Sequence, residues 1–262
     1  MARVLSGIVA IPIVLGIVVY GSPWLFFALV FLAVMVGCRE FFSMISRAGT
    51  PGFPLAGYPL AAALLFCFYF PSNFIPEWGV AAGALMPLAW FLGDRNVEAA
   101  VKNMAASLLG VLYVAGLSGY FILIRALEGG NHFIVLLFMI VWFGDTAAYY
   151  GGRAFGRRPL APAVSPNKTL EGAAFGLSGS LLAGLVAHYG FLETLPVGHC
   201  LIVAGICGMI GQFGDLVESL IKRSTGVKDS GSLIPGHGGV LDRIDSLLFA
   251  GPAFYIYYRI FL

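Results

Sequence analysis

The feature that most restricts the fold is a succession of apolar runs. A helix needs roughly 17–25 mostly apolar residues to cross the hydrocarbon core of a bilayer. Nine such runs occur here, with Pro, Gly or charged residues between them: 4–20, 22–38, 56–71, 78–93, 104–127, 132–151, 170–190, 198–221 and 246–262. The second and fourth could also be partly re-entrant. The sequence predicts an all-α, polytopic integral membrane protein with about nine transmembrane helices.

Composition supports a chain embedded in a membrane. Hydrophobic residues make up 59% and charged residues 11%, against about 45–50% and about 25% in soluble domains. The longest polar stretches, 152–169 and 222–245, are too short for a soluble domain. We therefore expect one membrane domain over 1–262, with spans that carry no motif in 1–130 and a catalytic part in 131–262.

The distribution of Lys and Arg predicts the orientation. Cytoplasmic loops of membrane proteins carry an excess of basic residues. With nine spans and a cytoplasmic N-terminus, all 15 basic residues except Arg125 and Arg259 fall in cytoplasmic segments. The C-terminus is then outside. The net charge of +2 indicates no partner by itself, and no nucleic-acid partner is expected.

Aspartates gather in the second half, each within or next to a span: Asp145, Asp215, Asp229, Asp242 and Asp245. A carboxylate at the bilayer centre costs about 2.5–3.5 kcal/mol on insertion scales. One alone could form an interhelical ion pair or lie at a solvated helix end. Several together repel one another, and clustered hard oxygen ligands favour Mg²⁺. We predict one or two metal ions.

Helical spacing groups these residues on two faces. Asp215, Ser219 and Lys222 stand at i, i+4 and i+7 near the end of the eighth run, so they share a face. Asp242 and Asp245, at i and i+3, share a face at the start of the ninth. Both groups are predicted at the cytoplasmic membrane edge.

The loop between these groups combines cations with glycines. Lys222, Arg223 and Lys228 carry positive charge, while Gly238 and Gly239 allow backbone N–H groups to approach an anion closely. Carboxylates that hold a metal, beside cations that hold phosphates, suit a metal–polyphosphate complex. His237, between glycines, could be functional or structural.

A second basic loop includes Arg157 and Arg158 and continues into Ser165-Pro-Asn167-Lys168-Thr169. It could bind phosphate through Asn167 and Lys168. Alternatively, it is an ordinary cytoplasmic loop, and 165–171 simply begins the next helix.

The stretch from Ser219 to Asp245, SLIKRSTGVKDSGSLIPGHGGVLDRID, resembles the signature of the CDP-diacylglycerol synthases, or phosphatidate cytidylyltransferases. Gly144-Asp145 and 165–169 also resemble landmarks of that family, which extends the likeness over about 140–262. The resemblance implies the reaction of CTP with phosphatidic acid to give CDP-diacylglycerol and pyrophosphate. It also implies a cation-dependent homodimer in the inner membrane, with its site facing the cytoplasm.

The resemblance suggests roles in three groups. Metal ligands are Asp215, Asp242 and Asp245, with Asp145 as a further ligand or support. Residues that neutralise phosphate charge or assist the reaction are Lys222, Arg223, Lys228, Asp229, His237 and Arg243. Residues that contact substrate are Ser219, Asn167, Lys168, Gly238 and Gly239.

Two other functions remain open from the sequence alone. A CTP-dependent polyprenol or lipid kinase also brings a nucleotide to a lipid, but the acceptor attacks the γ-phosphorus. A secondary transporter could use intramembrane acids to bind a coupling ion. The acids gather toward one membrane face and no internal repeat is evident, which disfavours a transporter.

Overall fold

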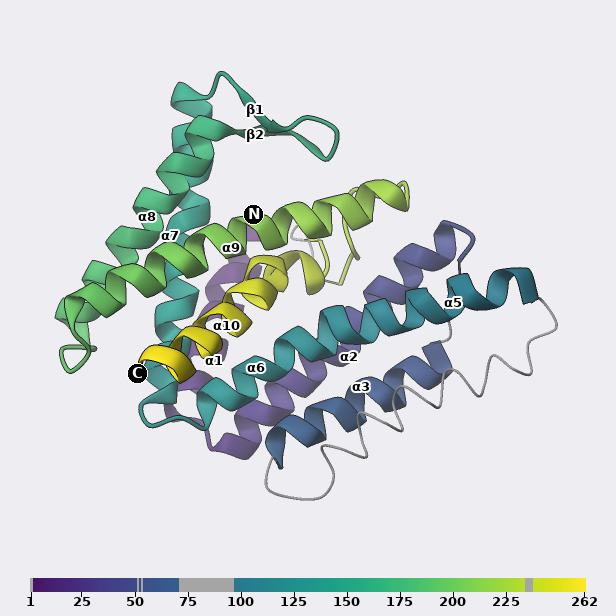
Figure 1. Ribbon diagram of the computed structural model, residues 1–262, viewed down its shortest axis with the longest axis horizontal. Coiled ribbons are helices and arrows are strands. Elements are labelled where there is room, and N and C mark those ends of the chain that lie inside the picture. The colour runs from purple at the N-terminus through teal and green to yellow at the C-terminus, as the bar shows by residue number, and fades with distance from the viewer. Residues whose placement is uncertain (1, 51, 53, 71–96, 234–237) are drawn as a thin grey trace. The chain divides into compact units, whose positions relative to one another are not determined.

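The computed structural model describes residues 2–50, 52, 54–70, 97–233 and 238–262 (Figure 1). The chain forms two compact units. The first unit comprises Met1–Leu123 with Lys222–Arg243, and the second comprises Ile124–Ile221 with Ile244–Leu262. The signature segment therefore folds largely with the N-terminal half, although nearly a hundred residues of the second unit separate them in sequence.

Helices account for most of the described structure. In chain order they are α1 (Ala2–Tyr20), α2 (Pro23–Arg47), α3 (Pro54–Tyr69), α5 (Val97–Gly110), the π-helix η1 (Val111–Gly116), α6 (Leu117–Arg125), α7 (Gly130–Phe155), α8 (Leu170–Gly190), α9 (Val197–Ser224) and α10 (Leu241–Phe261). The strands β1 (Pro159–Ala161) and β2 (Ser165–Thr169) form an antiparallel pair. The all-α class is confirmed apart from this hairpin. The run predicted at 78–93 lies outside the described residues.

Five of the described helices are long and apolar enough to cross a membrane. They are Pro23–Arg47, Ala99–Arg125, Gly130–Phe155, Leu170–Gly190 and Val197–Ser224. Ala10–Tyr20 and Pro54–Tyr69 are shorter apolar helices. Several candidate spans are thus present, and a total of nine stays a prediction.

α2 begins where the sequence predicts and extends further than expected. The Ser22 hydroxyl accepts a hydrogen bond from the Leu25 N–H at 3.2 Å, and Pro23 occupies the first turn, where its missing N–H costs nothing. The predicted end at residue 38 was wrong, because α2 continues to Arg47. Charged residues do not stop a helix, so Arg39 and Glu40 lie within it.

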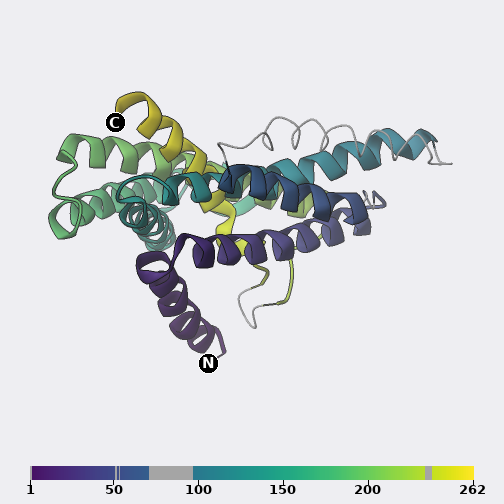
Figure 2. The same ribbon diagram turned by 90° about the horizontal axis from the view of Figure 1, so that it is seen from below.

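In the first unit, α2, α3 and the continuous α5–η1–α6 helix run beside one another (Figures 1 and 2). Aromatic rings fill one part of this packing. The Phe27 ring lies 5.1 Å from Trp24, 5.2 Å from Phe66 and 4.7 Å from Tyr69, measured between centroids. Phe41, farther along α2, is fully buried. Phe41 lies next to Glu40, and its ring packs against Tyr113 of η1 with centroids 6.1 Å apart.

In the second unit, α7 and α8 pack closely along each other, and the β1–β2 hairpin extends from one end of the pair (Figure 1). Small residues permit this approach: a Cβ on Gly144 would lie 2.6 Å from the Ser180 hydroxyl oxygen. Thr169 caps α8 by accepting a hydrogen bond from the Gly172 N–H at 3.0 Å. Of the segment 165–171, residues 165–169 therefore form β2, and the helix begins only at Leu170.

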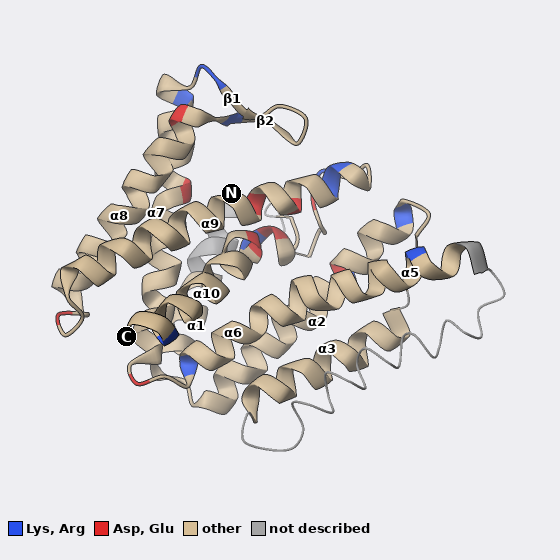
Figure 3. Ribbon diagram, viewed as in Figure 1, with Lys and Arg blue, Asp and Glu red and all other residues tan. Residues whose placement is uncertain are grey.

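Charged residues lie toward the ends of several helices (Figure 3). In α9 the first Lys, Arg, Asp or Glu is Asp215, and none occurs in the eighteen helix residues before it, 197–214. In α8 the only such residue is Glu171, in the first turn. This pattern suits helices whose middle lies in hydrocarbon and whose ends reach polar surroundings.

Candidate active site

Asp242 and Lys222 form the central ion pair of the first unit. The Lys222 ammonium nitrogen lies 2.6 Å from Asp242 Oδ1, and the two side chains are only 12% and 6% exposed. Asp242 is in the first turn of α10 and Lys222 in the last turn of α9. The structure thus brings together two residues that the sequence predicted to act at one site.

The second oxygen of Asp242 accepts three hydrogen bonds. The donors are the Ser230 N–H at 2.9 Å, the Ser230 hydroxyl at 2.9 Å and the Gly239 N–H at 2.8 Å. Both carboxylate oxygens therefore have donors in fixed positions. Burial opposes ionisation of Asp242, but the Lys222 ammonium and the Gly239 and Ser230 donors outweigh it, so the pKa of Asp242 lies below its usual value.

A second buried carboxylate, Glu40, contacts the same segment, and sequence reasoning missed it. Glu40 is 7% exposed. Its Oε1 accepts a hydrogen bond from the Val240 N–H at 3.0 Å, and its Oε2 accepts from the Leu241 N–H at 2.8 Å and the Ser230 hydroxyl at 3.3 Å. The one available signal was an acid within a largely apolar helix, which the prediction that the helix ends at 38 hid.

Glycines let the two carboxylates and the backbone approach each other. A Cβ on Gly231 would lie 2.6 Å from Glu40 Oε1, and one on Gly239 would lie 2.5 Å from Glu40 Oε2. Gly238 has φ +79°, and a Cβ there would lie 2.5 Å from Asp242 Oδ2. The sequence argument expected Gly238 and Gly239 to expose N–H groups to a phosphate. Here the Gly239 N–H binds the Asp242 carboxylate of the protein itself.

The second unit holds Asp215 in a more open pair. Lys168, at the end of β2, places its ammonium nitrogen 2.5 Å from Asp215 Oδ2 on α9, and the side chains are 29% and 30% exposed. The nearby basic loop is held by Glu171, whose Oε2 accepts the N–H groups of Arg157 and Arg158 at 3.0 and 3.1 Å. The Arg158 side chain is 74% exposed.

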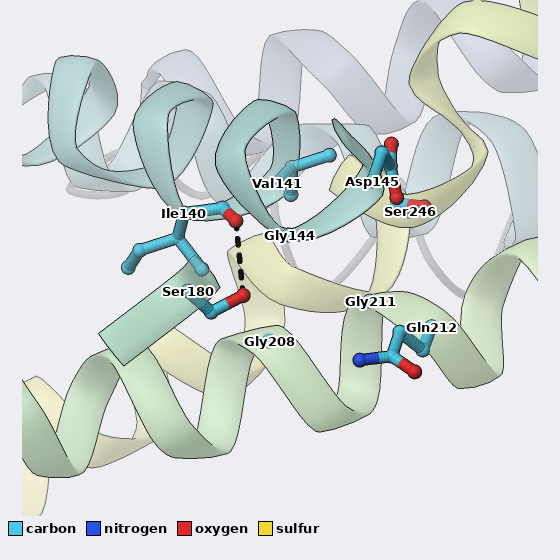
Figure 4. A pocket seen from close by; sticks show the side chains of 9 residues that line it. All are labelled: Ile140, Val141, Gly144, Asp145, Ser180, Gly208, Gly211, Gln212 and Ser246. Atoms are coloured by element: carbon cyan, nitrogen blue, oxygen red, sulfur yellow. Dashed lines mark hydrogen bonds between the residues drawn. The ribbon is translucent and has the colours of Figure 1, made fainter. Parts of the chain in front are cut away.

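Asp145 lies at a small cavity between α7, α8, α9 and α10 of the second unit (Figure 4). The cavity measures about 10 Å³, which is close to the minimum for one water molecule. Polar groups from Asp145, Ser180, Gln212 and Ser246 line it. Ser180 is engaged, because its hydroxyl donates to the Ile140 carbonyl at 3.0 Å, whereas Asp145 and Ser246 lie beside each other at one end.

The remaining predicted residues are placed as follows. Asp245 Oδ1 accepts a hydrogen bond from the Ser246 N–H at 2.6 Å, and Ser219 is half-buried on α9. His237 lies outside the described residues. The exposed residues of the predicted set are Asp145, Asn167, Arg223, Lys228, Asp229 and Arg243.

The donor chemistry fits a hard cation such as Mg²⁺. Within the described ranges, no three His, Cys, Asp or Glu side chains are grouped as a complete metal centre. However, lysine ammonium groups lie directly against Asp215 and Asp242, so both carboxylates already attract a cation. In the same described part, the Ser246 hydroxyl oxygen is buried without a hydrogen-bond partner, and it lies beside Asp145. Carboxylate and hydroxyl oxygens are ligands that Mg²⁺ accepts.

A family model described as "Cytidylyltransferase family" matches residues 1–261. The chain belongs to this family. The match includes the N-terminal spans and Glu40, whereas the signature resemblance alone covered only the C-terminal half.

Three proteins named phosphatidate cytidylyltransferase are similar over nearly their whole length. The protein of Bacillus subtilis is 32% identical over 99% of this chain and 97% of its own length. Those of Staphylococcus haemolyticus and Synechocystis are 34% and 30% identical, and in each case the alignment covers 95% of the relative.

Proposed function

We propose that this protein is a phosphatidate cytidylyltransferase, which converts CTP and phosphatidic acid to CDP-diacylglycerol and pyrophosphate. The observation that carries this proposal is the alignment of nearly the entire chain with relatives of that name at 30–34% identity. The buried Lys222–Asp242 pair within the signature segment supports it, because it joins an acid and a cation suited to binding a charged substrate.

The chemical step is an in-line displacement at phosphorus. A phosphate oxygen of phosphatidic acid attacks the α-phosphorus of CTP and forms the new P–O bond of the diphosphate. The bond from the α-phosphorus to the oxygen bridging to the β-phosphorus breaks, and that oxygen leaves with pyrophosphate. A phosphate monoester is already ionised near pH 7, so no general base has to remove a proton.

The residues divide this work between charge neutralisation and positioning. Lys222, Arg223, Lys228 and Arg243 bind phosphate oxygens and stabilise negative charge on the departing pyrophosphate. Asp229 and His237, which belong to the same signature segment, assist the reaction. Ser219, Asn167, Lys168, Gly238 and Gly239 contact the two substrates.

Asp215, Asp242 and Asp245 are the proposed Mg²⁺ ligands, and Asp145 is a further ligand or support. Mg²⁺, when bound, neutralises charge on the triphosphate and on the pyrophosphate that leaves. Since Lys222 and Lys168 lie against two of these acids, each lysine can turn to a phosphate oxygen once its carboxylate has another cation. A second cation is compatible with four acidic side chains.

The same proposal includes a homodimer of nine-span subunits in the cell inner membrane, with the signature loop in the cytoplasm and Leu262 outside. An active site at the cytoplasmic edge lets both a soluble nucleotide and a lipid reach it. Single cysteines introduced at Lys228 and Leu262 test the orientation in intact cells. An impermeant thiol reagent should label the cysteine at position 262 and not the one at 228. Ready labelling at 228 overturns this topology.

Labelled nucleotides test the reaction. Purified protein in detergent receives phosphatidic acid, Mg²⁺ and CTP labelled at either the α- or the γ-phosphorus. Label should enter the organic-soluble lipid only from α-labelled CTP, in step with pyrophosphate release, and Asp242→Asn should abolish most of the transfer. Label that enters lipid from γ-labelled CTP assigns the protein to lipid kinases instead.

A further inference from the structure

Glu40 holds the start of α10 from a helix that is 200 residues earlier in the chain. The first N–H groups of a helix have no partners within it, and a negative charge beside them is favourable. Those of Val240 and Leu241 bind one oxygen each of the Glu40 carboxylate. Glu40 therefore acts as a cap for α10 that its own local sequence does not provide.

The same carboxylate is linked to Asp242 through Ser230. The Ser230 hydroxyl lies 3.3 Å from Glu40 Oε2 and 2.9 Å from Asp242 Oδ2, but it has one proton to donate. The shorter contact favours donation to Asp242. The Asp242 N–H also points to the Ser230 oxygen, at 3.3 Å. A change at Glu40 thus reaches Asp242 both through Ser230 and through the backbone of residues 240–241.

Packing leaves no room for this arrangement to shift. Gly231 and Gly239 lie against opposite oxygens of Glu40, and a methyl group at either position would overlap the carboxylate. Glu40 is itself fixed because its neighbour Phe41 is fully buried in the first unit. The carboxylate is therefore a rigid point around which the signature segment is built.

We propose that Glu40 is a positioning residue for the reaction, which sets the orientation of Asp242 and, through it, of Lys222. It acts without touching substrate or metal. This inference rests on the proposed function only in assigning Asp242 and Lys222 to the active site.

Glu40→Gln tests the role, because it keeps the shape and removes the charge. The glutamine amide keeps one acceptor oxygen, but its NH2 group is a donor and cannot accept from the N–H groups of Val240 and Leu241. We expect kcat to fall about 10–100-fold, the range for residues that orient metal ligands, and the Mg²⁺ concentration for half-maximal activity to rise. Glu40→Asp keeps the charge on a shorter side chain. Its kcat and Mg²⁺ midpoint should lie between those of the wild type and of Glu40→Gln.

Glu193→Gln is the matched control, since it makes the same chemical change at an exposed position of the second unit. It should leave kcat, the Mg²⁺ midpoint and melting temperature unchanged. If Glu40→Gln does not fold, Glu40→Asp carries the test. A variant that loses only melting temperature or yield, with kcat per folded molecule and the Mg²⁺ midpoint as in the wild type, overturns the proposal.

A stability measurement keeps this inference separate from the proposed function. Gly231→Ala should lower the melting temperature strongly beside Glu40 and much less in a Glu40→Ala background, where the overlapping carboxylate is gone. Equal losses in both backgrounds refute the rigid contact, whatever reaction the protein performs. If the contact is confirmed but wild-type protein incorporates no label from α-labelled CTP, the proposed function fails instead.

Discussion

Asp242 and Asp215 are both acids paired with a lysine, but their surroundings differ. Asp242 is 6% exposed, and four donors from three residues hold both of its oxygens. Asp215 is 30% exposed and lies against Lys168 at the end of a hairpin. The first arrangement costs several kcal/mol to desolvate and needs every donor. The second is screened by water and easily opened. One unit holds its acid rigidly, while the other leaves its acid accessible.

The largest expected effect is a loss of activity when either acid is replaced. The melting temperature then distinguishes the two acids. Asp215→Asn and Asp242→Asn should each lower activity by about 10–100-fold or more, as Asp245→Asn should, because each removes a charge from the site. Only Asp242→Asn should also lower the melting temperature, because its amide N–H groups would face donors. Activity above about a tenth of wild type at saturating Mg²⁺ would exclude the residue as a metal ligand.

Removal of the lysines compares the two ion pairs directly. Lys222→Met leaves a buried carboxylate without its cation and should cost about 3–5 kcal/mol of unfolding free energy. Lys168→Met breaks a partly exposed pair and should cost about 1 kcal/mol or less. Denaturant unfolding in detergent measures both. Similar losses for the two variants would show that the difference in burial has no energetic consequence.

Ser246→Ala should have a smaller effect. Its hydroxyl oxygen is buried without a partner in the described part of the chain, and removal of an unsatisfied polar atom is neutral or stabilising. The melting temperature without Mg²⁺ should therefore stay the same or rise slightly. If the hydroxyl supports a cation beside Asp145, then the Mg²⁺ midpoint for activity should rise. Ser246→Thr is the control, because it retains the hydroxyl and should keep the wild-type Mg²⁺ midpoint.

The smallest expected effect concerns pH. The pKa of Asp242 lies below its unfolded value, so its contribution to stability is present above about pH 4 and is lost as the pH falls through the folded pKa. In Lys222→Met, the Asp242 carboxylate is buried without its cation, and burial then disfavours its ionised form. The loss caused by Lys222→Met should therefore be greatest near pH 7 and shrink toward pH 4. A loss that grows on acidification would contradict this sign.

The sequence predicted the helices well where apolar runs end at Gly, Pro or a capping residue. α8 occupies 170–190 as expected, and Thr169 caps it. The sequence-based prediction was wrong at the end of α2, because charged residues alone were treated as the end of the helix. In the candidate site, the shared motif predicted that Lys222 and Asp242 act together, but their ion pair was found only in the structure. Glu40 could not be found that way, since its role depends on tertiary contacts with residues 190–201 positions away.

That separation has a consequence for biogenesis. A ribosome adds about 5–20 residues per second, so roughly 10–40 s pass between synthesis of Glu40 and of the backbone groups that bind it. During this interval α2 carries a carboxylate whose later donors do not yet exist. A chain that ends before α10 never supplies them. The nascent first unit therefore stays incomplete until the start of α10 is made, and a chain truncated before it keeps in α2 a carboxylate without these two N–H donors.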